Sequence, residues 1–175
     1  MINPHSLLEV SRDLTVLDKR RPRQASLRRA ISSAYYALFH LLIQDATEQL
    51  IGGGSAAVGK AVRATAARWF THQKMEEICT QFQGSAVPRR LRDRLPPGAT
   101  ISPALQNVAR IFVELQRARH TADYDPIPRY RRQEASSLVE RAAEAFEDWQ
   151  GASGDPLRGA FLLLLLTGES IIKER

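Results

Sequence analysis

The longest helical pattern in the chain runs from Arg23 to Ile51 without a glycine or proline. Apolar residues recur along it at intervals of three and four, which places one apolar stripe on an α-helix: Leu27, Ile31, Ala34, Leu38 and Leu41. A polar stripe runs beside it, formed by Arg29, Ser33, Tyr36 and His40. Buried hydrogen-bonding groups without partners cost roughly 1–3 kcal/mol each. This polar stripe therefore marks either a structural network or a binding site.

Similar periodicity predicts further helices on both sides of this segment. Asn3-Pro4 and Ser102-Pro103 each combine an N-cap residue with a proline in the first turn, which is typical of a helix start. The expected helices span residues 4–19, 60–83, 103–124, 130–150 and 155–166. Val62 and Trp69 are expected among the packing residues of the 60–83 helix. Breaks are expected at the glycine-rich residues 51–55 and in the proline- and arginine-rich residues 84–100.

These patterns predict an all-α fold, an antiparallel up-and-down bundle of four to five helices with an extra short C-terminal helix. Residues 1–151 would form the bundle. Residues 152–175 would form an apolar helix and tail that pack on the bundle or at a dimer interface. The apolar run from Ala160 to Leu166 is far shorter than the roughly 20 residues that a membrane-spanning helix needs.

Composition adds limits on function. The formal charge is +6 at neutral pH, which favours an anionic partner such as nucleic acid, although many basic proteins bind none. The arginine-rich turn at residues 19–23 is either an anion-facing patch or a solvated turn. Cys79 is the only cysteine, so an internal disulfide and a multi-cysteine zinc site are excluded. We expect a cytoplasmic protein with no signal peptide, metal, cofactor or membrane partner.

The 103–124 helix carries charged residues on its apolar side. Its stripe of Leu105, Val108, Phe112 and Leu115 continues at intervals of four to Arg119 and Asp123. An ion pair at i, i+4 is therefore expected on the face that points toward the core.

Two segments together resemble the HEPN superfamily (higher eukaryotes and prokaryotes nucleotide-binding). They are residues 27–40, LRRAISSAYYALFH, and residues 115–125, LQRARHTADYD. The resemblance covers about Pro4 to Trp149 and is nearest to a bacterial branch with an alanine-tyrosine-tyrosine helix and a later alanine-aspartate-tyrosine helix end. It implies a helical bundle that forms a homodimer. Many members are metal-independent endoribonucleases, often toxins paired with antitoxins, and others bind nucleotides.

The active ribonucleases of this superfamily carry an arginine followed after four to six residues by a histidine. Here the positions at that spacing from Arg119 hold Tyr124, Asp125 and Pro126, and those from Arg117 hold Ala122, Asp123 and Tyr124. The resemblance therefore implies a nucleotide-, RNA- or partner-binding protein without an intact ribonuclease motif. Its partners would be a second copy, RNA or a nucleotide, and an antitoxin-type protein.

The alternative is a metal-independent endoribonuclease. In that case Arg119 and Arg29 would hold phosphate, and His40 or His120 would transfer a proton, because imidazole titrates near neutral pH. The candidate catalytic residues are thus His40, Arg119 and His120. The candidate nucleotide- or RNA-binding residues are Arg29, Tyr36, Asp123 and Tyr124. A silent protein would instead use Arg119, Asp123 and Tyr124 as a buried structural network.

Overall fold

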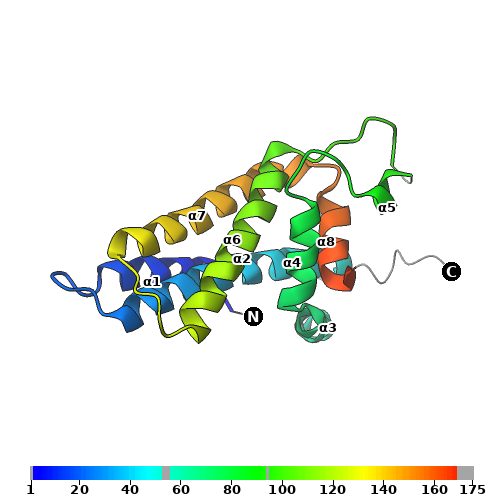
Figure 1. Cartoon of the computed structure of the whole chain (residues 1–175). Coiled ribbons are helices and arrows are strands. Elements are labelled where there is room, and N and C mark those ends of the chain that lie inside the picture. The colour runs from blue at the N-terminus through cyan, green and yellow to red at the C-terminus, as the bar shows by residue number, and fades with distance from the viewer. Residues whose placement is uncertain (1, 53–55, 94, 169–175) are drawn as a thin grey trace. The chain divides into compact units, whose positions relative to one another are not determined.

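The computed structural model describes residues 2–52, 56–93 and 95–168, and their regular structure is helical apart from an isolated bridge between Ala86 and Thr100. The predicted all-α fold class is confirmed. Figure 1 shows the elements, which are α1 (Pro4–Val16), α2 (Gln24–Ile51), α3 (Ala57–Ala66), the 3-10 turn η1 (Ala67–Trp69), α4 (His72–Gln81), α5 (Arg89–Arg92), α6 (Pro103–Tyr124), α7 (Arg132–Gly151), the 3-10 turn η2 (Ala152–Gly154) and α8 (Arg158–Thr167). Within the described residues, no helix is both long and apolar enough to cross a membrane.

The chain forms two compact units. Unit 1 comprises Leu42–Arg110 and the chain from Asp148 onward, and unit 2 comprises Ile2–Leu41 and Ile111–Glu147. Helices α2, α6 and α7 each contribute one part to each unit. Helix α8 packs against α4 within unit 1, and the boundary expected after residue 151 stays a prediction.

Unit 2 is an antiparallel bundle of α1, the first part of α2, the second part of α6 and the first part of α7. Ser32 and Tyr36 of α2 contact Asp123 and Arg119 of α6, so residue numbers rise along one helix as they fall along the other. The pairs His5–Phe146 and Arg12–Glu140 show the same for α1 and α7. Part of its core is a cluster of Leu27, Ile31, Ala122 and Ala135, with Ala118, Tyr130 and Leu138 packed against it.

Helix starts follow the predicted caps. The Asn3 side chain accepts a hydrogen bond from the His5 backbone at 3.0 Å, and Pro4 begins α1. Ser102 accepts one from the Leu105 backbone at 3.3 Å at the start of α6. Gly52 follows α2 with φ of 62°, the left-handed conformation that commonly ends a helix.

Unit 1 is held together largely by α4 and α8. Phe161 lies 4.9 Å from Phe82 and 6.1 Å from Trp149 between ring centroids. The Arg158 guanidinium lies over the Trp149 ring at 3.9 Å and donates to Asp45 at 2.7 Å. The leucine-rich helix is therefore explained by packing within this unit.

The single helix predicted for residues 60–83 is wrong. Helix α3 ends at Ala66, and the η1 turn that follows it ends at Trp69. Phe70 and Thr71 then have extended backbone, and α4 begins at His72. The Thr71 hydroxyl accepts a hydrogen bond from the Lys74 backbone at 3.3 Å, so this threonine caps a new helix. Val62 and Trp69, expected in the core, are 47% and 59% exposed.

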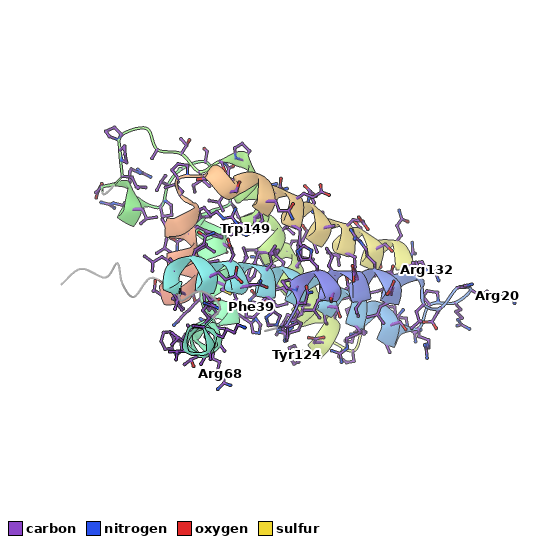
Figure 2. The ribbon with its side chains drawn as sticks, turned by 180° about the vertical axis from the view of Figure 1, so that it is seen from behind. Arg20, Phe39, Arg68, Tyr124, Arg132 and Trp149 are labelled. Carbon is purple, nitrogen blue, oxygen red and sulfur yellow. The ribbon has the colours of Figure 1, made fainter. Side chains whose placement is uncertain are left out.

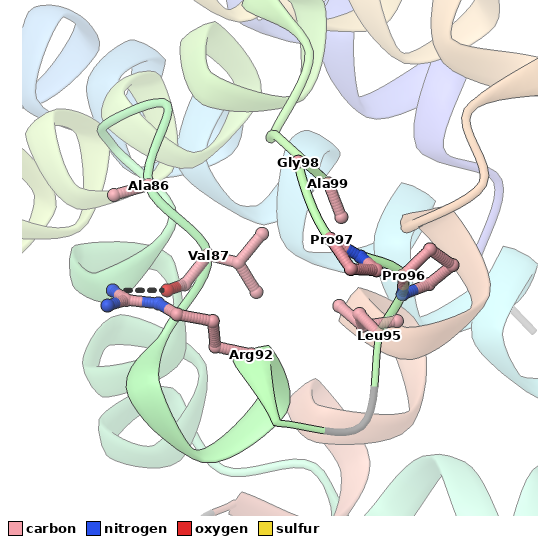
Figure 3. Close-up of a pocket in the computed structure, with 8 residues that line it drawn as sticks. All are labelled: Ala86, Val87, Arg92, Leu95, Pro96, Pro97, Gly98 and Ala99. Carbon is pink, nitrogen blue, oxygen red and sulfur yellow. Dashed lines mark hydrogen bonds between the residues drawn. The ribbon is translucent and has the colours of Figure 1, made fainter.

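The linker at residues 84–100 forms a closed loop. Its ends are joined by the Ala86–Thr100 bridge and by a hydrogen bond from Ile101 N to Ser85 O at 2.9 Å. The loop encloses a pocket of about 340 Å³. Arg92 donates a hydrogen bond to the Val87 carbonyl at 3.3 Å, and Figure 3 shows the residues that line the pocket. The pocket is lined by Ala86, Val87, Arg92, Leu95, Pro96, Pro97, Gly98 and Ala99. Most of the expected glycine-rich break (residues 53–55) and the expected tail (residues 169–175) lie outside the described residues.

Candidate functional site on α2 and α6 of unit 2

Arg119 joins the two helices that carry the resemblance. Its Nη2 donates a hydrogen bond to the Tyr36 hydroxyl at 2.6 Å. Its Nε lies 2.9 Å from Asp123 Oδ2 in the expected i, i+4 ion pair, although the N–H direction does not make this a hydrogen bond. The side chains of Arg119 and Asp123 are 13% and 25% exposed, so solvent screens the pair only in part.

Three tyrosine rings surround the same guanidinium. Its central carbon lies 5.3 Å from the centroids of Tyr36 and Tyr124 and 5.9 Å from that of Tyr35. Such distances allow cation–π attraction. Figure 2 labels Tyr124 on α6, and Tyr124 is 65% exposed.

The environment of Arg119 favours its charged form. Burial alone would lower the pKa of its guanidinium, but the Tyr36 hydroxyl, which accepts its hydrogen bond, and the Asp123 carboxylate together raise the pKa above its ordinary value. Arg119 is therefore a fixed positive charge here, and it cannot act as a general acid or base near neutral pH.

Ser32 completes the cluster and was missed by the sequence analysis. It is fully buried, and its hydroxyl donates a short hydrogen bond to Asp123 Oδ1. Asp123 thus has one oxygen against Ser32 and the other against Arg119. Spacing does not single out Ser32, because Ser32 and Ser33 lie four and three residues before Tyr36 and so both lie near it on α2. The predicted polar stripe contains Ser33.

The remaining candidate residues lie around this cluster. The His40 ring stacks on Tyr36 with 6.3 Å between centroids. His120 is exposed and its ring lies 5.1 Å from that of Tyr124, while Arg29 is exposed on α2. The contacts described for Arg119 include neither Arg29 nor His120. The structure therefore brings Tyr36, Arg119, Asp123 and Tyr124 together, with His40 reaching them through Tyr36.

Comparisons of the chain with protein-family models, with curated proteins and with solved structures gave no match. The chemistry of the site rests on its own geometry. Among the described residues, no group of three or more His, Cys, Asp and Glu side chains is placed to hold a metal ion. In the Arg119 cluster, the guanidinium donates to the Tyr36 hydroxyl and lies at ion-pair distance from the Asp123 carboxylate, which also accepts from Ser32.

Arg28, also missed by the sequence analysis, organises the end of α6. Its guanidinium donates to the carbonyls of Ala122 at 2.8 Å and Asp125 at 2.6 Å, and also to that of Pro128. The last carbonyls of a helix lack partners within it, and the planar fork of an arginine can bind several at once. Arg28 thus fixes the segment that joins α6 to α7.

A second candidate surface consists of residues 17–23 and 125–131, here called the basic loop pair. Arg132 donates to the backbone carbonyls of Asp18 and Lys19, and the Gln24 side chain makes two hydrogen bonds with the Tyr130 backbone, of 2.8 and 2.9 Å. The exposed cations of these loops include Lys19, Arg20, Arg21, Arg129 and Arg131. Figure 2 shows Arg20 and Arg132 at the same end of unit 2.

The carboxylates near the basic loop pair accept hydrogen bonds from these loops or from residues next to them. Asp18 accepts hydrogen bonds from the Arg23 backbone and from Ser26. Glu134 accepts one from the Arg131 backbone at 2.6 Å. The sequence left open whether residues 19–23 face an anion, and it did not reveal that a second basic loop lies beside them.

Proposed function

We propose that the protein is an HEPN-like helical protein that binds RNA through the basic loop pair and does not cleave it. The observation that carries this proposal is the set of hydrogen bonds that joins the two loops. They bring together, at one end of unit 2, five exposed cations besides Arg23, which pairs with Asp18. The motif resemblance on α2 and α6 supports the same class of ligand. We place the protein in the cytoplasm, where such a ligand is available.

A phosphate backbone is the ligand whose chemistry suits these loops. Lysine and arginine neutralise phosphates along a strand, and the release of condensed counterions drives binding without sequence preference. Arginine predominates among the five cations, and its planar guanidinium can bind a phosphate through two parallel hydrogen bonds. The chain as a whole carries a formal charge of +6, which adds long-range attraction.

The geometry of the Arg119 cluster favours binding without catalysis. The phosphate-stabilising role of the alternative endoribonuclease needs an arginine that faces the substrate. Arg119 is instead held by Tyr36 and Asp123 and is largely covered. We therefore assign Arg119, Asp123, Tyr36 and Ser32 to a structural network that holds α2 against α6 within unit 2.

The test is fluorescence anisotropy with a labelled single-stranded RNA over a range of salt concentrations. Arg20→Glu/Arg21→Glu and Arg129→Glu/Arg131→Glu should each weaken binding by at least about tenfold and lower the salt slope by about one to two. The matched control is Lys60→Glu/Arg68→Glu on α3, which changes the net charge by the same amount. Its affinity should fall much less.

Two results would reject the proposal. One is the absence of RNA binding by the wild-type protein at low salt. The other is an equal loss of affinity in the loop variants and the α3 control, because binding would then follow net charge alone.

The resemblance also implies protein partners, and we include them in the proposal as a second copy of the chain and an antitoxin-type protein. Light scattering coupled to gel filtration measures the mass of the particle directly. A mass of one 19.6 kDa chain at all concentrations would reject the homodimer.

A further inference from the structure

Helix α3 exposes its larger apolar side chains. Val58 is 75% exposed, Val62 is 47% exposed and Trp69, in the adjoining η1 turn, is 59% exposed. Val58 and Val62 are four residues apart and so share one side of α3. The buried residue of this helix is Ala66. Ala66 lies four residues after Val62 on the same side of the helix, so this apolar stripe is buried at its C-terminal end and exposed at Val58 and Val62.

The charged residues of the sequence segment that contains α3 have one sign. Residues 49–75 contain no aspartate or glutamate and four basic residues, which are Lys60, Arg63, Arg68 and Lys74. Lys60 and Arg68 are exposed. Arg63 is partly buried and donates a hydrogen bond to the Gly52 carbonyl at the end of α2. We give the name α3 surface to the exposed residues Val58, Lys60, Val62, Arg68 and Trp69, of which Lys60 lies on the side of α3 away from Val58 and Val62.

We infer that the α3 surface lies against a membrane that contains anionic lipids. A short amphipathic helix with basic residues can rest in the headgroup region with its apolar side turned toward the acyl chains, without spanning the bilayer. Tryptophan favours this boundary, because its ring is apolar and its N–H is polar. Anionic headgroups would pair with Lys60 and Arg68.

Other occupants fit these residues less well. A nucleic acid would use the cations and stack a base on Trp69, but it offers nothing apolar to Val58 and Val62. A second copy of α3 would bring two basic surfaces together, which is unfavourable. The combination of apolar side chains and cations without any acidic residue therefore favours a lipid surface. This inference uses unit 1 alone and does not depend on the proposed RNA binding.

The structure supplies its own probe for the test. The two tryptophans differ in exposure, because Trp69 is 59% exposed and Trp149 is 2% exposed. Vesicles of phosphatidylcholine with phosphatidylserine should shift the emission of the wild-type protein to the blue, and vesicles of phosphatidylcholine alone should not. The shift should disappear in Trp69→Phe, because the remaining Trp149 is already buried.

Substitutions on the α3 surface test whether this surface binds the vesicles. Co-sedimentation with the same vesicles measures the binding of each variant. Val58→Glu/Val62→Glu and Lys60→Glu/Arg68→Glu should each lower the partition coefficient by at least about tenfold. These side chains are exposed, so circular dichroism should show unchanged helix content. Arg20→Glu/Arg21→Glu in the basic loop pair is the charge-matched control and should keep most of the vesicle binding.

Three outcomes would overturn the inference. The first is no sedimentation of the wild-type protein with phosphatidylserine vesicles. The second is equal loss of vesicle binding in the control and in the α3 variants. The third is loss of RNA binding in the α3 variants without any vesicle binding by the wild-type protein, which would assign the α3 surface to nucleic acid instead.

Discussion

Arg119 of α6 donates a hydrogen bond to the hydroxyl of Tyr36 on α2 at 2.6 Å. The two residues are 83 positions apart in the sequence, so this bond fixes how two distant segments meet within unit 2. Arg119 continues the apolar stripe of α6 and so lies on the same side of the helix as that stripe. Asp123, one turn later, provides the counter-charge. The cluster thus sets the register between α2 and α6.

Loss of this bond should destabilise the fold. Arg119→Ala leaves the Asp123 carboxylate and the Tyr36 hydroxyl without their cation, so we expect a loss of about 2 kcal/mol in the free energy of unfolding. Tyr36→Phe removes one hydrogen bond and should cost about 1 kcal/mol. Urea denaturation of the two single variants and the double variant measures each loss of unfolding free energy. The loss in the double variant should be about 1 kcal/mol smaller than the sum of the two single losses.

Arg20→Ala is the control, because it also removes an arginine side chain and Arg20 is exposed. Its effect should stay within about 0.5 kcal/mol. Strict additivity of the Arg119 and Tyr36 substitutions would show that the two side chains do not interact energetically, and the structural role would have to be abandoned.

The protein should not cleave RNA in the presence of EDTA. Arg119 is held by Tyr36 and Asp123, and the described contacts do not place a histidine beside its guanidinium. Gel analysis of labelled RNA incubated with wild type, His40→Ala and Arg119→Ala should show the same intact strand in all three. Cleavage by the wild-type protein that disappears in either variant would establish the endoribonuclease alternative.

The inward ion pair could be predicted from the sequence because it depends on helical spacing within one segment. Arg119 and Asp123 continue a run of apolar residues at intervals of four, and the structure contains the pair. The sequence does not identify Ser32 as the partner of Asp123, because Ser32 and Ser33 are adjacent and both are buried. Which of them meets Asp123 depends on the rotation of α2 against α6, which no local pattern specifies.

The break between α3 and α4 shows a different limit. A continuous helical period from residue 60 to 83 predicts one helix, yet Phe70 is buried from an extended segment and Thr71 caps a new helix. A threonine within a helical pattern is ambiguous, because it is tolerated inside helices and favoured at caps.

The contact between residues 17–23 and 125–131 could not be predicted from local patterns either. It depends on Arg132 and Gln24, which bind backbone atoms of the opposite loop.

Asp18 should make stability depend on pH in the acid range. The backbone N–H of Arg23 is the main cause that holds the pKa of Asp18 below its ordinary value of 3.8. Burial opposes this effect, and the Ser26 hydroxyl and the Arg23 guanidinium lower the pKa further. Because the folded pKa is lower than the unfolded one, the stabilisation is present above the unfolded pKa and is lost as pH falls through the folded pKa.

Asp18→Asn tests this dependence. The wild-type protein should exceed the variant in urea midpoint at about pH 6, and the difference should shrink below about pH 4. Asp13→Asn on the exposed side of α1 serves as the control. A difference between wild type and Asp18→Asn that stays constant down to about pH 2 would contradict the assigned contacts.

Cys79 should be unreactive in the folded protein. The thiol is fully buried, and burial, with a smaller contribution from the charge of Glu76, raises its pKa well above the ordinary value. The thiolate is the reactive form, so iodoacetamide at about pH 8 should label Cys79 in urea but not in the native state. Mass spectrometry measures the label. Equal labelling rates in both conditions would show that α4 opens readily.

Arg28→Ala should weaken RNA binding indirectly. Arg28 binds the carbonyls of Ala122, Asp125 and Pro128, so its loss frees the segment that carries Arg129 and Arg131. Fixed cations bind a phosphate backbone better than mobile ones, because less conformational freedom is lost. We expect an affinity for RNA lower by about fivefold, with the salt slope nearly unchanged. Arg28→Lys keeps the charge but cannot bind three carbonyls in a planar fork, so it should resemble Arg28→Ala in affinity. Full affinity in Arg28→Lys would mean that Arg28 acts through its charge rather than by positioning the loop.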